Sequence, residues 1–270
     1  MKIVALWLVA ILIAQANVVG VVKKLEGNAK VQHEHALKQL SIQQGAEVMA
    51  GDTLLTYQGS KVVVELADKS SIVVDEYAKL TLLSQDEFTQ NGGKVYFKIT
   101  KRKGATGVKV NTPFAIIGVK GTQFVVTDAN SSQSLALNEG LVGVDSPDGS
   151  DFEKIDEDKV KKMMAQTPNQ VMAEFEAYKK ELYKEFAEYT ASFDLKAGKK
   201  LQFNGKQVLE STMESEDSAQ FKLYMSDAEF NAISKELEKS VTGKKMSADE
   251  AFSDGFFKDE NDKSLDKDAF

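Results

Sequence analysis

The sequence contains no cysteine, and it has only two histidines among 270 residues. Without cysteine, the protein cannot form disulfide bonds, use thiol catalysis, or bind iron–sulfur clusters or cysteine-ligated zinc. Both histidines lie in one short stretch, which leaves no multi-histidine metal site and no well-separated catalytic triad. The formal net charge of −7 disfavours nucleic acid as a partner. The composition therefore favours a binding protein over an enzyme, and it implies no cofactor.

The main apolar run of the sequence lies at its N-terminus. Met1 and Lys2 form a short, positively charged N-terminal region, and residues Ile3–Ile13 are all apolar. Ala14 and Ala16 are small residues at the two positions that signal peptidase recognises. This order is typical of a secretory signal peptide. A retained membrane anchor is the alternative, but the run is shorter than the roughly 20 residues that a spanning helix needs. We therefore predict that residues 1–16 are a signal peptide cleaved after Ala16, that the protein is periplasmic or secreted, and that it meets the membrane only through this transient segment.

Residues 17–146 read as short strands separated by turns that contain glycine. Val62, Val64 and Leu66 alternate with Val63 and Glu65, which is the period of two of a β-strand. Runs of the same kind occupy residues 71–74, 79–83, 95–99, 123–127 and 141–144. Many short strands at close spacing predict a mainly β fold, with an all-β domain of the sandwich, roll or solenoid type.

The balance of charge changes after residue 146. Residues 17–145 carry 14 basic and 13 acidic side chains, whereas residues 146–270 carry 19 basic and 28 acidic ones. Such a shift indicates a boundary. We predict a smaller α+β region with amphipathic helices over residues 147–258, followed by an acidic tail over residues 259–270.

Three helix starts are predicted in this second half. Thr167–Gln170 combines a capping threonine, a proline at the first helical position and a glutamine three residues after the cap. An apolar stripe from Val171 to Tyr189 follows it at helical spacing and predicts about five turns. We expect this stripe to pack within the protein, with a partner surface as the alternative. Ser226–Glu229 and Ser247–Glu250 repeat the capping pattern.

Two further stretches of the second half read as strands. Leu201–Leu209 predicts a hairpin with a two-residue turn at Asn204 and Gly205. Phe221, Leu223 and Met225 alternate, which predicts one more strand.

The most distinctive motif is the run from Thr112 to Phe124, which resembles the signature of the FecR-domain family. Its matching residues are Thr112, Pro113, Gly118, Val119, Lys120, Gly121, Thr122 and Phe124. Earlier and later pieces match in order, from Gly51-Asp52 to Glu139-Gly140, so the resemblance covers roughly residues 18–145. Lys120 stands where the family usually has arginine. The lysine ammonium is a point charge and cannot make the planar two-pronged contact of an arginine guanidinium.

The resemblance implies a regulatory role rather than a reaction. Regulators of the FecR family use this domain outside the inner membrane, where it takes part in sensing the state of an outer-membrane transporter. They join it to a cytoplasmic anti-sigma segment and one membrane-spanning helix, neither of which we expect here. We therefore expect an exported stand-alone FecR-domain protein that binds or scaffolds a protein partner in the envelope without being an enzyme. A link to iron uptake or to other envelope regulation follows from the resemblance alone.

The signature residues also have physical roles of their own. Pro113 fixes its φ and starts a strand. Gly118 and Gly121 allow a close backbone approach that a Cβ would block. We expect the Thr122 hydroxyl to bond the turn and Phe124 to lie in the core.

Two other functions remain open from the sequence. A peptidoglycan or polysaccharide module would use exposed aromatic rings, for which Tyr57, Tyr77 and Tyr96 are the candidates. A hydrolase with an unrecognised carboxylate site is the third alternative, and it is disfavoured because no nucleophile and base stand in a known arrangement.

The segment His33-Glu34-His35 is the only pattern that suggests a metal. On a strand, His33 and His35 would point the same way and share an ion. Two ligands are too few for a protein metal site, so we expect a solvated edge strand instead.

A basic cluster and one modification motif complete the candidates. Lys98, Lys101, Arg102 and Lys103 follow one another closely. We expect them to form a charged hairpin tip that protects a sheet edge, with a surface for an acidic partner as the alternative. Asn130 lies in an Asn-x-Ser motif with an acidic residue two positions before it, where we favour chance occurrence over glycosylation.

Overall fold

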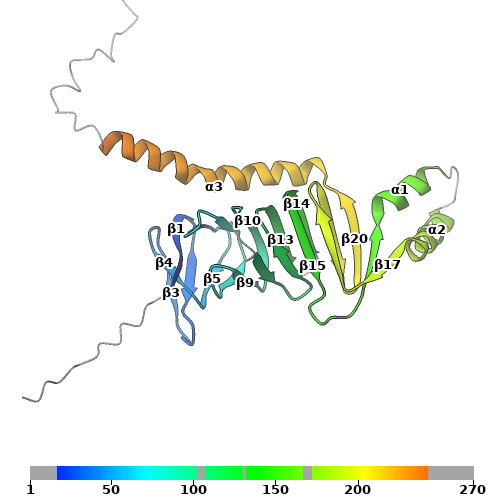
Figure 1. Cartoon of the computed structure of the whole chain (residues 1–270), viewed down its shortest axis with the longest axis horizontal. Coiled ribbons are helices and arrows are strands. Elements are labelled where there is room, and N and C mark those ends of the chain that lie inside the picture. The colour runs from blue at the N-terminus through cyan, green and yellow to red at the C-terminus, as the bar shows by residue number, and fades with distance from the viewer. Residues whose placement is uncertain (1–16, 102–106, 130–131, 167–171, 243–270) are drawn as a thin grey trace, which may run out of the picture. The chain divides into compact units, whose positions relative to one another are not determined.

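The structure is a computed structural model that describes residues 17–101, 107–129, 132–166 and 172–242 (Figure 1). These residues contain twenty strands and three helices. The chain divides into two units, one reaching to Glu229 and one beginning at Phe230. In the second unit, the described residues continue a helix to Thr242.

The first unit contains two β-sheets. Sheet A has eleven strands in the spatial order β17 (Ala187–Thr190), β16 (Phe152–Asp156), β20 (Gln207–Thr212), β19 (Lys199–Asn204), β14 (Ser132–Glu139), β13 (Gln123–Ala129), β10 (Gly93–Lys98), β7 (Ser71–Val74), β6 (Lys61–Leu66), β1 (Val18–Glu26) and β4 (Glu47–Met49). Sheet B has nine strands in the order β18 (Ser192–Lys196), β15 (Leu141–Asp145), β12 (Ile116–Val119), β11 (Val108–Asn111), β9 (Glu87–Gln90), β8 (Lys79–Leu82), β5 (Asp52–Thr56), β2 (Ala29–Gln32) and β3 (Gln39–Ser41).

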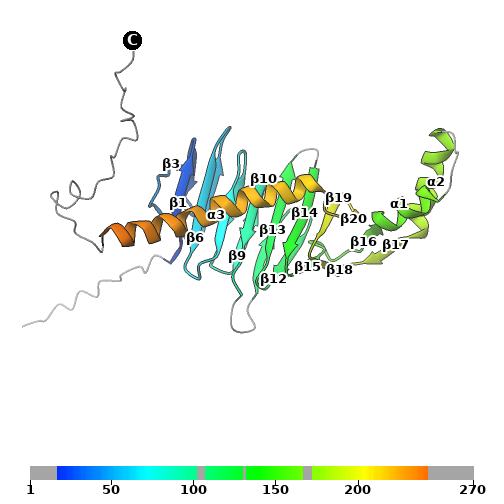
Figure 2. The ribbon, with the colours of Figure 1, turned by 90° about the horizontal axis from the view of Figure 1, so that it is seen from above.

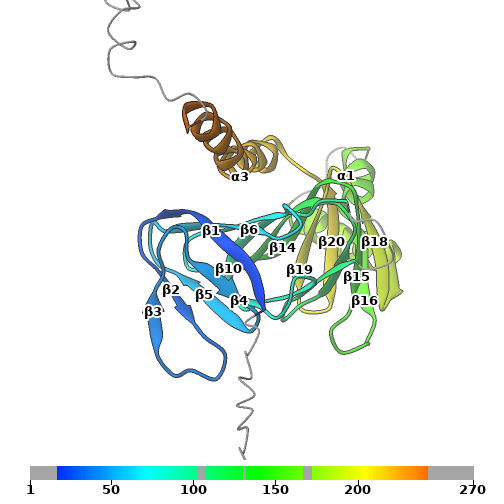
Figure 3. The same cartoon turned by 60° about the vertical axis from the view of Figure 1, so that its left-hand side comes forward.

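The two sheets pack face to face as a sandwich (Figure 3). In β6, Val62 and Val64 point into the core between the sheets, whereas Val63 belongs to a second cluster on the outer face of sheet A. This alternation is the one predicted from the sequence, and it follows from the period of two of a pleated strand. The chain passes repeatedly from one sheet to the other, so each sheet gains strands along the whole unit. The predicted mainly β fold is confirmed.

Helix α3 (Ser215–Thr242) covers part of the outer face of sheet A with its N-terminal half (Figure 2). Tyr224 stacks on Tyr96 of β10 with ring centroids 5.6 Å apart, and Phe221 meets the same ring edge-on at 6.1 Å. Asp227 forms an ion pair with Lys61 at 2.7 Å. Apolar packing and this ion pair together hold the helix on the sheet.

The strands of the second half of the chain extend the two sheets. β19 pairs with β14 in sheet A, and β18 pairs with β15 in sheet B. Leu201 and Phe203 of β19 are buried in the same core as the earlier strands. The compact unit therefore extends to Glu229 and does not end at the boundary expected near residue 146.

Helices in the second half differ from those expected. α1 (Glu157–Ala165) was not predicted, although Asp156 caps it by accepting a hydrogen bond from the Lys159 amide. α2 (Met172–Glu185) ends before Tyr189, which lies in β17 with its side chain exposed. Thr167–Val171 and the third predicted start at residues 247–250 lie outside the described residues, as do residues 259–270.

The α3 region corrects two further predictions. Ser226 is an interior residue of α3 and does not cap a helix, because α3 already begins at Ser215. Phe221 and Met225 therefore belong to a helix and not to a strand. The predicted hairpin at residues 201–209 is present, but its turn residues are Gly205 and Lys206, one position later than expected.

No helix among the described residues combines the length and the apolar character needed to cross a membrane.

Candidate functional site

The first signature residues form the turn between β11 and β12. The Thr112 hydroxyl donates to the Ala115 carbonyl at 2.8 Å and accepts from the Ala115 amide at 2.9 Å. Pro113 is exposed within this turn, so it precedes the strand instead of starting it. Thr112 thus has the turn-bonding role that we expected of Thr122.

The later signature residues also support the fold. Gly121 has a φ of 72°, and a Cβ there would lie 3.0 Å from the Lys101 Cα. Thr122 is buried, and its hydroxyl has no partner among the described residues. Phe124 stacks on Phe97 in the core with ring centroids 4.9 Å apart. The close approach predicted for Gly121 and the core position of Phe124 are therefore present.

Gly118 behaves differently from Gly121, because nothing around it requires a glycine. It lies in the middle of β12 directly opposite Gly143 of β15. A Cβ on Gly118 would have no atom within 4 Å, and a Cβ on Gly143 would come no closer than 3.9 Å to the Gly118 carbonyl oxygen. Both residues have ordinary strand φ values. The expected steric reason for Gly118 is therefore wrong.

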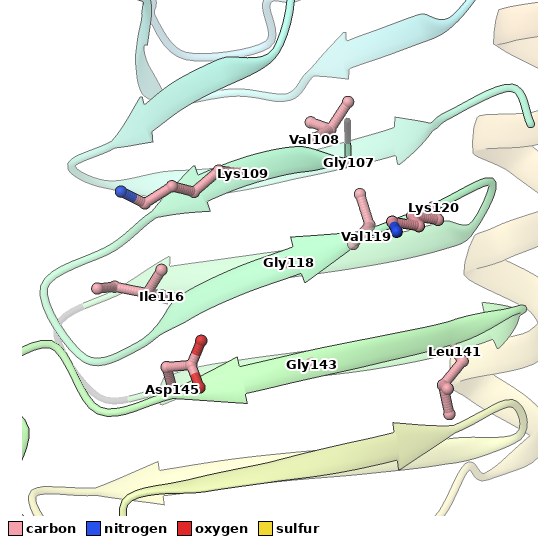
Figure 4. Close-up of a pocket in the computed structure, with 10 residues that line it drawn as sticks. All are labelled: Gly107, Val108, Lys109, Ile116, Gly118, Val119, Lys120, Leu141, Gly143 and Asp145. Atoms are coloured by element: carbon pink, nitrogen blue, oxygen red, sulfur yellow. The ribbon is translucent and has the colours of Figure 1, made fainter. Parts of the chain in front are cut away.

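The two glycines form the floor of an open groove on the outer face of sheet B (Figure 4). Its volume is about 500 Å³. The residues that line it are Gly107, Val108, Lys109, Ile116, Gly118, Val119, Lys120, Leu141, Gly143 and Asp145. We call this feature the glycine groove. Two signature residues, Gly118 and Lys120, thus share one exposed surface, whereas the side chain of Val119 between them is buried in the core.

The side chains around the bare floor differ between its two ends. Ile116 lies opposite Asp145 at one end, and Lys120 lies beside Leu141 at the other (Figure 4). Leu141 is 52% exposed, although leucine is usually buried. Each end of the groove therefore has one apolar and one charged residue. The end with Ile116 and Asp145 is acidic, and the end with Leu141 and Lys120 is basic.

One charge near the groove is already neutralised. The Lys109 ammonium lies 3.3 Å from a Glu87 carboxylate oxygen, and the Asn111 amide donates to the same oxygen. The hydrogen bond from Asn111, followed by that from Lys109, lowers the pKa of Glu87 below its usual range. Asp145 and Lys120, by contrast, have no ion-pair partner among the residues described, so both remain available to a ligand.

Sequence reasoning identified Gly118 and Lys120 but did not find Gly143, Leu141 or Asp145 as their neighbours. These residues come together only through the register of β12 and β15. A glycine on the outer face of each predicted strand was the available signal, because glycine is disfavoured within strands.

The two histidines do not share a strand face. β2 ends at Gln32, and His33, Glu34 and His35 lie in the following turn. His33 Nδ1 lies 2.8 Å from the Asp52 carboxylate, whereas the side chain of His35 is almost fully exposed. The described residues contain no group of three or more histidine and carboxylate side chains placed to hold a metal ion. The assumption of an edge strand was wrong at this point.

The basic cluster is only partly within the described structure. Lys98 ends β10, and Lys101 is exposed just after it and packs against Gly121. Arg102 and Lys103 lie outside the described residues, as does Asn130. A partner surface at this cluster remains a prediction.

Only two of the three candidate tyrosines for a sugar site are exposed. Tyr57 and Tyr77 are 36% and 61% exposed and lie in the turns after β5 and before β8. Tyr96 is fully buried beneath α3, so it cannot contact a polysaccharide.

Comparison with known structures finds distant similarity. Two crystal structures of a candidate anti-sigma factor from Parabacteroides distasonis, at 2.50 Å and 1.65 Å resolution, match at 14% identity with a TM-score of 0.41. The match covers 62% of this chain and 62% of that protein. A structure described as a cell surface anchoring domain matches at 23% identity with a TM-score of 0.24, over 24% of this chain and 86% of that one.

Comparison of the sequence with curated proteins finds no match. A family model described as FecR protein matches residues 52–143. This segment includes β5 to β14, the first part of β15 and all the lining residues of the glycine groove except Asp145. The FecR family model therefore matches the segment that contains the signature motif, as the resemblance predicted.

Proposed function

We propose that this protein is a regulatory protein of the bacterial envelope that binds a protein partner through the glycine groove and catalyses no reaction. The FecR domain supports the regulatory role. The predicted signal peptide supports export to the periplasm or beyond. The link to iron or to another envelope signal rests on the family alone.

The pair Gly118 and Gly143 is the observation that carries this proposal. A glycine within a strand costs roughly 0.5–1 kcal/mol relative to alanine, and it leaves no side chain to pack. Neither position has a positive φ or a neighbour that a Cβ would strike. A ligand that rests on the bare backbone explains why both positions lack a side chain.

The lining favours a protein over a sugar and over a reaction. Ile116 and Leu141 supply aliphatic contacts, and the described residues that line the groove include no aromatic ring on which a sugar could stack. Asp145 is the carboxylate of the lining and Asp194 of β18 lies opposite Gly143, but the described lining residues include no hydroxyl or imidazole that could act with them. This set of groups can hold a polypeptide but supplies no acid–base pair.

Site-specific photo-cross-linking in the envelope tests the proposal. A photoreactive amino acid at Leu141 should cross-link one protein partner, and the same group at Lys79, which is exposed on β8 of the same sheet, should not. The Gly118→Val variant carrying the probe at Leu141 should lose the product while remaining folded. Equal cross-linking from both positions, or a product that persists in Gly118→Val, would rule out the groove. Retention of the protein on purified peptidoglycan that depends on Tyr57 and Tyr77 would favour the polysaccharide alternative.

A further inference from the structure

We propose that the occupant of the glycine groove is an extended segment of the partner protein that carries an aromatic residue, with a basic residue two positions to one side and an acidic residue two positions to the other. This inference rests on the proposed function, because it specifies the partner of the same site. It follows from the floor, the length and the charges of the groove.

The floor fits a flat side chain. Gly118 and Gly143 lie directly opposite each other and expose two adjacent stretches of backbone with no side chain above them (Figure 4). Aromatic rings pack well over glycine in β-sheets, because the ring covers backbone that would otherwise be exposed to water. Ile116 and Leu141 lie on either side of this bare area and supply aliphatic contacts to the ring edges.

The length of the groove fits an extended segment. Ile116 is the first residue of β12, and Lys120 directly follows its last residue. The two are four positions apart, and Gly118 lies midway between them. At a rise of about 3.3 Å per residue, these positions span about 13 Å. In an extended segment lying along β12, side chains i, i+2 and i+4 point the same way and have the same spacing. The central side chain then lies on the glycines, and the outer two lie over the two ends.

The charges define the outer two residues. Asp145 faces outward opposite Ile116, and Lys120 marks the other end beside Leu141. Lys196, which pairs with Leu141 from β18, adds a second positive charge at that end. A basic side chain is therefore favoured at the Asp145 end and an acidic one at the Lys120 end. The bound segment can run in either direction along β12, because the rule depends only on which end of the groove each flanking residue lies over.

Selection from a library of random displayed peptides on the immobilised full chain tests the inference. The unmodified protein should select an aromatic residue flanked at two positions on either side by one basic and one acidic residue. The double variant Lys120→Glu, Lys196→Glu should select two basic flanks, and Asp145→Lys should select two acidic flanks. Each reversal should also weaken the peptide selected by the unmodified protein by about three- to tenfold, as expected for exposed charge pairs.

Two glycine variants separate this inference from the proposed function. Gly118→Val and Gly143→Val should each abolish selection while their thermal transitions remain intact.

The unmodified protein could instead select peptides that these variants do not bind but that follow no aromatic or charge rule. The groove would then bind a protein of another kind, and only the inference would fail. If the selected peptides bind both variants unchanged, both claims fail. If no peptide is selected, the extended-segment inference is overturned, and cross-linking at Leu141 still decides the proposed function. A second copy of this chain as the occupant would appear as self-association that Gly118→Val removes, which also overturns the inference.

Discussion

At the scale of single residues, glycines in this protein serve opposite purposes. Gly93 and Gly121 have positive φ values of 75° and 72°, and a Cβ at either position would strike neighbouring backbone. Gly118 and Gly143 have neither constraint. The first two are required by the fold, whereas the second two keep a surface bare.

The first prediction concerns Gly118. Replacing it with valine should leave the free energy of unfolding unchanged or raise it by about 0.5–1 kcal/mol, because a β-branched residue suits a strand and restricts the unfolded chain. Calorimetry of the purified protein measures this change. A clear loss of stability would mean that Gly118 is needed by the fold.

The second prediction is the matched opposite. Gly93→Ala should destabilise the protein by about 2–3 kcal/mol, because its backbone is left-handed and the added Cβ would lie 2.6 Å from the Ala78 amide nitrogen. Chemical denaturation compares the two variants directly. Equal stability of Gly93→Ala and Gly118→Val would remove the distinction between the two classes of glycine.

Sequence reasoning could mark these residues but could not separate their roles. The signature motif placed Gly118 and Gly121 together and suggested the same steric reason for both. Their difference depends on φ and on which strand lies opposite, and neither is a local property of the sequence. The turn bonds expected of Thr122 are made by Thr112 for the same reason, because the turn closes around Thr112.

At the scale of elements, α3 illustrates how a pattern can be misread. Phe221, Leu223 and Met225 alternate in sequence, but Leu223 is exposed and Phe221 packs beside Tyr224. The spacing of three between Phe221 and Tyr224 is the helical one. The apolar face of α3 was hidden because Ser226 and Asp227 resemble a helix start in the middle of it.

The third prediction concerns the attachment of α3. The Tyr224 hydroxyl donates to the Asp75 carboxylate, and burial, followed by this bond, raises the pKa of Tyr224 well above its usual value. Because the folded pKa is raised, this contribution to stability is complete below about pH 10, the value for an exposed tyrosine, and is lost as the pH rises further. Tyr224→Phe should cost about 1–2 kcal/mol at neutral pH and reduce the loss of stability above pH 10.

Denaturation at several pH values, with hydrogen exchange of the α3 amides, measures this effect. The Tyr57→Phe variant is the control, since Tyr57 bonds only the side chain of Gln39 at an exposed site. An alkaline stability profile that is identical in Tyr224→Phe and the unmodified protein would show that this tyrosine does not hold the helix.

At the scale of the whole molecule, the sequence predicted the β architecture but not its extent. Strand alternation is local, so six of the fifteen described strands up to Asp145 were predicted, namely β6, β7, β8, β10, β13 and β15. Membership of a sheet is not local: β19 joins β14 across an intervening pair of helices. The change of charge near residue 146 marks a change of surface and not the end of the core.

The fourth prediction follows from this shared core. A chain of residues 17–146 should be unstable and prone to aggregation, because it exposes the edge of β14 and loses Phe152, Leu201 and Phe203 from the core. A chain of residues 17–229 keeps every strand and should fold. Soluble yield and the cooperativity of unfolding compare the two chains. A cooperative transition of residues 17–146 alone would show that the boundary expected from charge is a real domain boundary.

The central claim is that the bare backbone of Gly118 and Gly143 receives a protein partner. Amide NMR spectra of the isotope-labelled protein, recorded during titration with the partner captured by cross-linking at Leu141, test it most directly. The amide signals of Gly118 and Gly143 should shift or broaden first, together with those of Ile116 and Lys120. Signals that change instead in the Tyr57 and Tyr77 turns or on α2, while both glycines remain unaffected, would contradict it.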